Sequence, residues 1–231
     1  MAGVITHMVI AKEMLKFLPE GTIRNLDLFY LGTLAPDAVH ARMGYERVHK
    51  KHTHFRDDIP DPDFGLPENH TLYRERLEQF IKCNRNRTDG LLDFYRGYVV
   101  HILTDELFVL SIRREFCKRM EELGIEQNDK RFFEAIVADQ NRNDLLLVYR
   151  YEEMDGLREH MERALIYPIE GYISEQELED SRVWLIEHHF IKKHELIQPT
   201  YITYDRTLEF IYSSAEWIAD KMFNPKSPLR M

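Results

Sequence analysis

Apolar residues recur at three- and four-residue spacings along most of this chain, a pattern typical of amphipathic helices. In the first such segment, 4–18, the apolar positions are Val4, Ile5, Met8, Val9, Ala11, Leu15 and Leu18. The same periodicity predicts further helices at 71–85, 91–121, 129–150, 174–194 and 203–222, and a short apolar helix or turn at 25–35. No segment alternates with a period of two for long enough to predict a strand. The pattern predicts an all-α protein, a single-domain multi-helix bundle over 1–231.

One segment interrupts the helical pattern. RDDIPDPDFGLPENH, residues 56–70, contains three prolines, one glycine and five acidic residues. Prolines at these positions oppose a helix, so we expect an exposed loop. A loop of this length is either functional, as the wall or lid of a pocket, or simply an acidic solvated excursion.

The net charge, the cysteines and the lack of long apolar segments limit the classes of protein to which this chain can belong. The chain has 231 residues, 44% of them hydrophobic, and a net charge of −9. This charge argues against general nucleic-acid binding, which needs a basic face. Cys83 and Cys117 lie far apart and form no CxxC pattern. We expect both to be free thiols in a reducing compartment. We find neither a signal peptide nor a membrane-spanning segment in the sequence, and we expect a cytoplasmic protein.

The apolar stretch GYVVHILTDELF, residues 97–108, holds His101 and Asp105 one helical turn apart. Side chains four residues apart lie on the same face of a helix. Burying both without partners would cost several kcal/mol, about the price of unpaired polar groups in an apolar core. The two side chains therefore either pair with each other or bind a metal ion.

Four other residues could join them, and each also has an ordinary structural explanation. His7 lies in an apolar helix and could be a satisfied core histidine. Asp37 follows Pro36 and could be a helix N-cap. His52 and His54 flank a threonine and could belong to a surface run of histidines. Taken together, however, His7, Asp37, His54, His101 and Asp105 offer the nitrogen and oxygen donors that zinc prefers, enough for two ions sharing a carboxylate.

The order of these motifs resembles the zinc-dependent phospholipase C family, whose superfamily also contains the fungal single-strand-specific nucleases. Four stretches carry the resemblance: THMVIA (6–11), LGTLAPD (31–37), KKHTHF (50–55) and GYVVHILTD (97–105). They lie in the first 110 residues, and the chain is most similar to short intracellular members whose activity is largely inferred. The resemblance implies an all-α fold.

The resemblance also implies roles for the donors. His101 and Asp105 would come from the central helix, with Asp105 bridging two zinc ions. His54, followed by Phe as in the family motif, would bind the first ion, with His52 as the less favoured choice. Asp37 would bind that ion or act as the catalytic base, and His7 would bind the second ion.

The sequence departs from the family at two points. Secreted members ligate zinc through an N-terminal residue freed by cleavage of a signal peptide, whereas we expect no cleaved signal in this chain. No histidine follows shortly after Asp105, so one metal site is either missing or rebuilt from carboxylates, for which the sequence offers Glu106, Glu134, Asp139 and Asp144. On the late helix we expect His188, His189 and His194 to form a solvated polar face.

A phosphate substrate needs positive charge near the metal. Lys50, Lys51 and Arg56 provide a locally basic stretch among the candidate ligands, although such a run can equally be solvent-facing. The leading hypothesis is a zinc-dependent phosphoric-ester hydrolase acting on a small phosphoester or a phospholipid headgroup. The alternatives are a nuclease, a non-catalytic metal-binding or scaffold protein, and a protein whose histidines fill the core without metal.

Overall fold

A computed structural model describes residues 2–231, and throughout this range the regular elements are helical. The range contains no β-strand, only an isolated bridge between Ile169 and Ile173. Buried apolar side chains from the whole described range form one contiguous core. The prediction of an all-α protein is confirmed. None of the helices in this range combines the length and the apolar composition that a membrane span requires.

The α-helices are α1 (Val4–Met14), α2 (Leu26–Leu34), α3 (Arg47–Thr53), α4 (Pro67–Asn84), α5 (Leu92–Leu110), α6 (Ile112–Glu122), α7 (Lys130–Arg150), α8 (Met154–Arg163), α9 (Glu175–Leu185) and α10 (Tyr204–Phe223). Three short 3₁₀ segments are η1 (Leu15–Phe17), η2 (Ala35–Ala41) and η3 (Asp61–Asp63), and η4 (Ile186–Ile191) is a π-helix. The helices predicted at 4–18, 25–35, 71–85, 129–150 and 203–222 are confirmed, with boundaries shifted by a few residues.

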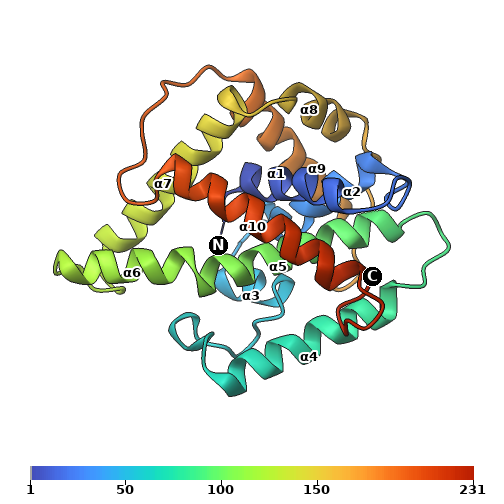
Figure 1. Ribbon diagram of the computed structural model, residues 1–231, viewed down its shortest axis with the longest axis horizontal. Coiled ribbons are helices and arrows are strands. Elements are labelled where there is room, and N and C mark those ends of the chain that lie inside the picture. The colour runs from blue at the N-terminus through green and yellow to red at the C-terminus, as the bar shows by residue number, and fades with distance from the viewer. Residues whose placement is uncertain (1) are drawn as a thin grey trace.

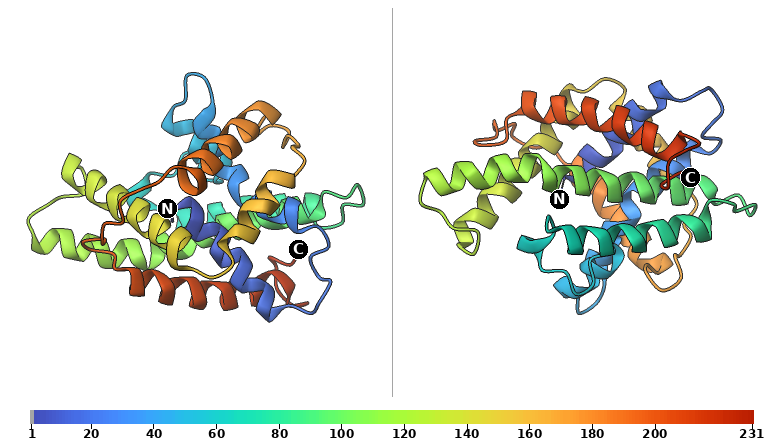
Figure 2. Two further views of the ribbon diagram at one scale, coloured as in Figure 1. Left: turned by 90° about the horizontal axis from the view of Figure 1, so that it is seen from above. Right: turned by 60° about the horizontal axis from the view of Figure 1, so that its bottom comes forward.

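Helix α5 runs through the middle of the molecule, and α10 and α4 lie on opposite sides of it (Figures 1 and 2). Its almost uniformly apolar first half is buried, as a central helix requires. The most extensive helix–helix contact is that between α5 and α2. The α5–α2 contact places the motif GYVVHILTD beside LGTLAPD, although they are far apart in sequence.

The beginning of α1 is capped by a residue from α7. Gly3, at the N-cap position, has no side chain to accept the free backbone N–H groups of the first turn. The carboxylate of Asp144 accepts hydrogen bonds from the backbone nitrogens of Ile5 and Thr6, both at 3.1 Å, and from Thr6 Oγ1 at 2.9 Å. A Cβ atom on residue 3 would collide with this carboxylate, which explains the glycine. This cap fixes the position of α1, and with it that of His7.

The helix predicted at 91–121 is two helices that meet at Ser111. The backbone of Ser111 leaves the helical region, with φ −122° and ψ −83°. Its hydroxyl donates to the carbonyl of Leu107 at 2.6 Å, a local hydrogen bond that competes with helix propagation. The apolar periodicity continues through the break, so the pattern alone could not reveal it.

The prediction of an exposed loop over 56–70 is wrong in two respects. Pro67 occupies the first turn of α4, a position where a helix tolerates proline, so the last four residues of the segment are helical. Ile59 and Phe64 are buried in the core rather than exposed. The segment is a packed connection between α3 and α4, and only part of it is solvated.

The sequence pattern missed two helices, and the predictions for residues 174–194 need correction. Short α3 lies within the histidine-rich segment, and α8 lies in a charged stretch without a predicted element. The helix predicted at 174–194 consists of α9 followed by the π-helix η4. His189 is buried on η4, so the three late histidines do not form a solvated face.

Candidate metal centre

The five predicted ligands, which come from four parts of the chain, meet at the centre of the molecule. They are His7 on α1, Asp37 on η2, His54 at the end of α3, and His101 and Asp105 on α5. The four ligands other than Asp37 are at most 1% exposed at the side chain, and Asp37 is 16% exposed. The donor atoms form two groups that could hold a metal: His7, His101 and Asp105 in one, and Asp37, His54 and His101 in the other.

His54 and His101 direct their Nε2 atoms at each other across 3.2 Å. The Nδ1 of His101 faces the carbonyl oxygen of Thr33 at 2.7 Å, and the Nδ1 of His54 faces that of Lys50 at 2.9 Å. Because a carbonyl only accepts, each Nδ1 must carry the hydrogen, and in a neutral ring Nε2 then holds a lone pair. Two lone pairs facing each other at this distance repel unless a cation lies between them. A carbonyl behind the outer nitrogen is also the usual support for a metal-binding histidine.

His7 and Asp105 add unpaired donors to the group. The ring of His7 is stacked on that of His101, with centroids 3.7 Å apart, and its Nε2 lies 3.4 Å from Asp105 Oδ1. Neither nitrogen of His7 has a hydrogen-bond partner of good geometry among residues 2–231. Buried polar atoms without partners are rare, and a bound ion is one of the few explanations for them.

The two oxygens of the Asp105 carboxylate face different groups of donors. Its Oδ1 faces His7, whereas its Oδ2 lies 3.4 Å from His54 Nε2 and 3.8 Å from His101 Nε2. This orientation suits the bridging role that the sequence suggested for Asp105. The backbone N–H of Ala2 also donates to Oδ1 at 2.8 Å, which brings the beginning of the chain to the site. The N-terminal metal ligand that the family resemblance raised would fall on Met1, which lies outside the described residues.

The two groups are unequal as metal sites. Asp37, His54 and His101 give a first ion three protein donors, and Oδ2 of Asp105, which lies 3.4 Å from His54 Nε2 and 3.8 Å from His101 Nε2, is a candidate fourth donor. Since His101 Nε2 can bind only one ion, the second group then retains His7 and the other oxygen of Asp105. Among residues 2–231 this second position is short of protein donors.

The charges of the site suit a cation. Burial and the neighbouring His7 lower the pKa of His101 well below its ordinary value, which keeps the ring neutral and able to bind metal. Burial alone would raise the pKa of Asp105, but contacts with His54 and His7 outweigh it and hold this pKa well below the usual range. Burial likewise opposes ionisation of Asp37, yet the charge of Lys50 and a hydrogen bond with His54 keep its pKa low.

Asp37 is held by Lys50, whose buried ammonium lies 2.5 Å from Asp37 Oδ1. The same residue contributes the carbonyl that orients His54. A carboxylate with so low a pKa is a weak base, so its electrostatics favour Asp37 as a ligand over the alternative role as general base.

A cleft of about 1350 Å³ opens beside the ligands. Of the five ligands, Asp37 is the one that lines it. One side carries charged and polar residues of the η2–α4 region, and the other is an apolar wall from α7 that includes Phe132, Phe133 and Ile136. The cleft is large enough for an organic ligand rather than for water alone.

The three predicted phosphate-binding residues have different environments. Lys50 lines the cleft, but its charge is neutralised by Asp37. Arg56 also lines the cleft and is buried. Lys51 is not part of the lining. Similarly, α3 separates the two neighbouring histidines: His54 turns inward, whereas His52 contacts Asp57 at 2.9 Å and stacks on Tyr172.

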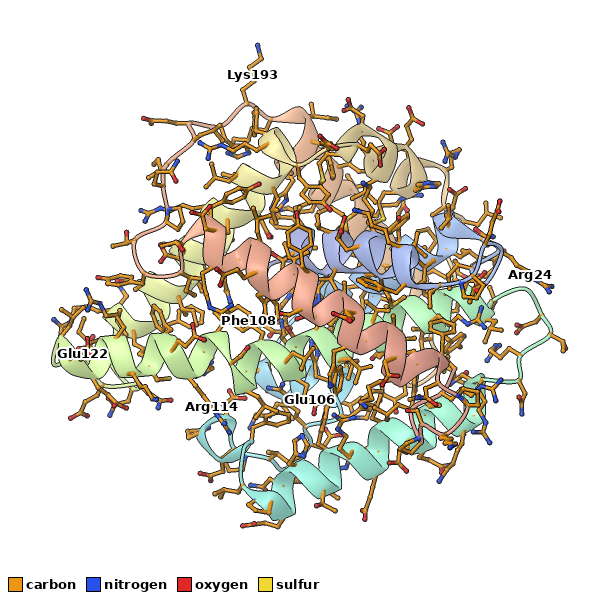
Figure 3. The ribbon with its side chains drawn as sticks, in the orientation of Figure 1. Arg24, Glu106, Phe108, Arg114, Glu122 and Lys193 are labelled. Atoms are coloured by element: carbon orange, nitrogen blue, oxygen red, sulfur yellow. The ribbon has the colours of Figure 1, made fainter. Side chains whose placement is uncertain are left out.

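The carboxylates considered for a rebuilt third metal site have other partners. Glu106 points away from the ligands toward α4, where it contacts His70 at 2.7 Å and Arg74 at 2.5 Å (Figure 3). Asp139 accepts backbone hydrogen bonds from residues 200–202, and Asp144 caps α1. Exposed Glu134 pairs with Lys130. Within residues 2–231 none of these carboxylates belongs to a group that could hold a metal.

Sequence reasoning missed the residues that orient the ligands. The carbonyls of Thr33 and Lys50 fix His101 and His54, and a backbone carbonyl leaves no signal in sequence. Asp144 was considered only as a possible ligand. Burial lowers the pKa of His189, which also lines the cleft, to about 4. Its spacing with Trp184 and Ser181, which also line the cleft, is helical and could have indicated a shared face.

Comparison of the chain with family models, with curated proteins and with solved structures gives no match. The assignment of the site therefore depends on the residues and their geometry.

Proposed function

We propose that this protein is a metal-dependent phosphoric-ester hydrolase of the phospholipase C-like type, with zinc as the first choice of metal. The observation that carries the proposal is the pair of Nε2 atoms of His54 and His101, which face each other with both outer nitrogens held by carbonyls. A cation between the two nitrogens would relieve their repulsion. The surrounding oxygens of Asp37 and Asp105 give the donor set the composition that zinc prefers.

The residues divide the chemical work between them. Bound ions would supply an activated water and a positive charge for the phosphoryl oxygens. His54, His101 and Asp105 form the buried floor of the site, and Asp37 stands at its boundary with the cleft. From there Asp37 can orient the attacking water by a hydrogen bond. Lys50 keeps Asp37 in place and leaves the site less negative toward an incoming phosphate.

The all-α arrangement is compatible with the fold of the phospholipase C and single-strand nuclease superfamily, and we include that fold type in the proposal. The support is the order of the ligands: the first helix, the segment after the second, the end of the third and the central helix. The substrate would enter through the cleft beside Asp37.

One observation favours a second candidate, a metal-binding protein without catalysis. The second metal position has only His7 and one oxygen of Asp105 among the described residues. If a single ion binds and Asp105 joins Asp37, His54 and His101 around it, four protein donors would complete its coordination and leave no open position for water. Such a protein would use the ion for structure.

Elemental analysis of untagged protein, purified without added metal, tests the proposal first. We expect about two ions per chain for a hydrolase with an open site. The protein should then hydrolyse p-nitrophenyl phosphate or bis(p-nitrophenyl) phosphate, and a chelator should abolish this activity. One tightly bound ion without turnover would favour the structural role. Absence of metal, with no uptake on addition of zinc, manganese or iron, would contradict both.

A further inference from the structure

Arg56 is a buried cation without an anion. Its side chain lines the cleft, yet the residue is only 6% exposed. Its Nε has no hydrogen-bond partner among residues 2–231, and the guanidinium forms no ion pair with a carboxylate in this range. Arginine stays protonated in proteins, so it cannot escape the cost of burial by losing its charge. The cost of burying an unpaired charge calls for a counter-anion.

The guanidinium is held in place from behind. It lies over the ring of Phe64, 3.9 Å from the ring centroid. Phe64 is itself buried and packs edge-on against Tyr73, with centroids 5.0 Å apart. Stacking on an aromatic face fixes the plane of the guanidinium but uses none of its N–H donors. The buried part of the segment 56–70 thus serves as a platform for Arg56.

The backbone also fixes Arg56 relative to the metal centre. Phe55 adopts a left-handed conformation with φ 58°, and the N–H of Arg56 donates to the carbonyl of Lys51 at 2.8 Å. This turn follows His54 directly. As a result, His54 faces the buried donors, while Arg56, two residues later, faces the cleft.

The other cations at this end of the cleft are already paired. Arg47 contacts Asp61 at 2.8 Å, and Lys50 contacts Asp37 at 2.5 Å. Burial raises the pKa of Asp61, but its contact with Arg47 and, to a smaller extent, the charge of Arg56 outweigh burial and lower this pKa. The carboxylate itself pairs with Arg47. The positive charge available to a ligand here therefore belongs to Arg56.

We propose that Arg56 forms an oxyanion subsite that binds a phosphate-sized group in the cleft, independently of the metal. A planar guanidinium with free N–H donors matches two oxygens of a phosphate at once. The identification of the anion as phosphate rests on the proposed function, whereas the need for an anion follows from the burial of Arg56. The subsite would hold a phosphoryl group of the substrate beside Asp37.

The test is titration of the chelator-treated protein with inorganic phosphate, followed by calorimetry or by phosphorus NMR, with helicity checked by circular dichroism. Arg56→Gln should weaken phosphate binding roughly tenfold or more, because charge-assisted hydrogen bonds are lost. Arg113→Gln is the matched control: it removes the same charge from the same cleft at a partly exposed position on α6. That variant should bind phosphate nearly as well as the unmodified protein.

The outcomes separate this inference from the proposed function. Equal weakening by Arg56→Gln and Arg113→Gln would show only a diffuse effect of charge and would overturn the subsite. Absence of phosphate binding by the unmodified, folded protein would overturn it as well. Phosphate binding that depends on Arg56 in a protein that neither retains metal nor hydrolyses esters would uphold the subsite and refute the hydrolase.

Discussion

Gly32 on α2 and Gly97 on α5 meet backbone to backbone where the two helices cross. A Cβ atom on Gly97 would overlap the carbonyl of Phe29, and one on Gly32 would overlap that of Phe94. The absence of both side chains lets the helices approach closely. The crossing thereby brings the carbonyl oxygen of Thr33, one residue after Gly32, to 2.7 Å from Nδ1 of His101, four residues after Gly97. It therefore sets the orientation of the His101 ring.

Gly97→Ala should therefore both destabilise the protein and disturb the site. The new methyl group has no flexible neighbour that can move aside, and we expect a loss of about 2 to 4 kcal/mol in the free energy of unfolding, in the range of overpacked cores or above it. Urea denaturation measures this loss. Gly156→Ala on α8 is the control, since a Cβ there meets no other atom. It should raise stability by about 0.5 to 1 kcal/mol, and a similar loss in both variants would refute the close crossing.

His54 and His52 form a matched pair for the metal assignment. His54→Gln should sharply lower the moles of metal bound per chain, because it removes one of the three grouped donors Asp37, His54 and His101. His52→Gln removes the same ring two residues away, where it stacks on Tyr172 and contacts Asp57 and the carbonyl of Gly171. Elemental analysis of both variants is the measurement. Equal metal content in the two would show that His54 is not a ligand.

His189 should make stability depend on pH. Burial, chiefly, lowers the pKa of this ring from 6.5 to about 4. Between these values the unfolded chain binds a proton that the folded chain does not, so the free energy of unfolding decreases as pH falls from 6.5 to 4. The decrease would reach about 3 kcal/mol. His189→Gln should remove it, as urea denaturation at several pH values would show, whereas parallel profiles for variant and unmodified protein would refute the assignment.

The sequence predicts those features of the structure that depend on neighbouring residues, and it misses those that depend on contacts between distant residues. The one-turn spacing of His101 and Asp105 in an apolar helix is a local signal, and it correctly anticipates two neighbouring donors on one face. The geometry of His54 depends on α3, which is too short for its periodicity to be recognised. The contacts that orient the ligands, such as the Thr33 carbonyl, are made by backbone atoms distant in sequence.

The same limit applies to the carboxylates. Spacing cannot distinguish a metal ligand from a residue that holds a loop, because both are buried acids on helices. Asp144 and Asp139 illustrate this: each binds backbone N–H groups of a segment about 60 or more residues away. Only the fold reveals which donors each acid meets.

Asp139 therefore provides a final test of structural against metal-binding roles. Its carboxylate accepts the N–H groups of Thr200, Tyr201 and Ile202 at 2.6 to 2.9 Å and so holds the segment that leads into α10. In Asp139→Asn the side-chain NH₂ group faces backbone N–H groups that also donate, so hydrogen bonds are lost. We expect a loss of about 2 kcal/mol or more in the free energy of unfolding. Bound metal should stay unchanged, which elemental analysis checks.

The control for this test lies on the same helix. Glu134 is exposed and forms a surface ion pair with Lys130, so Glu134→Gln should change stability by less than about 0.5 kcal/mol. Both substitutions remove one negative charge from α7. The difference between their losses in the free energy of unfolding therefore measures the contribution of the buried hydrogen bonds of Asp139. If Asp139→Asn instead lost metal at unchanged stability, the acid would belong to a third metal site, and the description of Asp139 as a tether would be wrong.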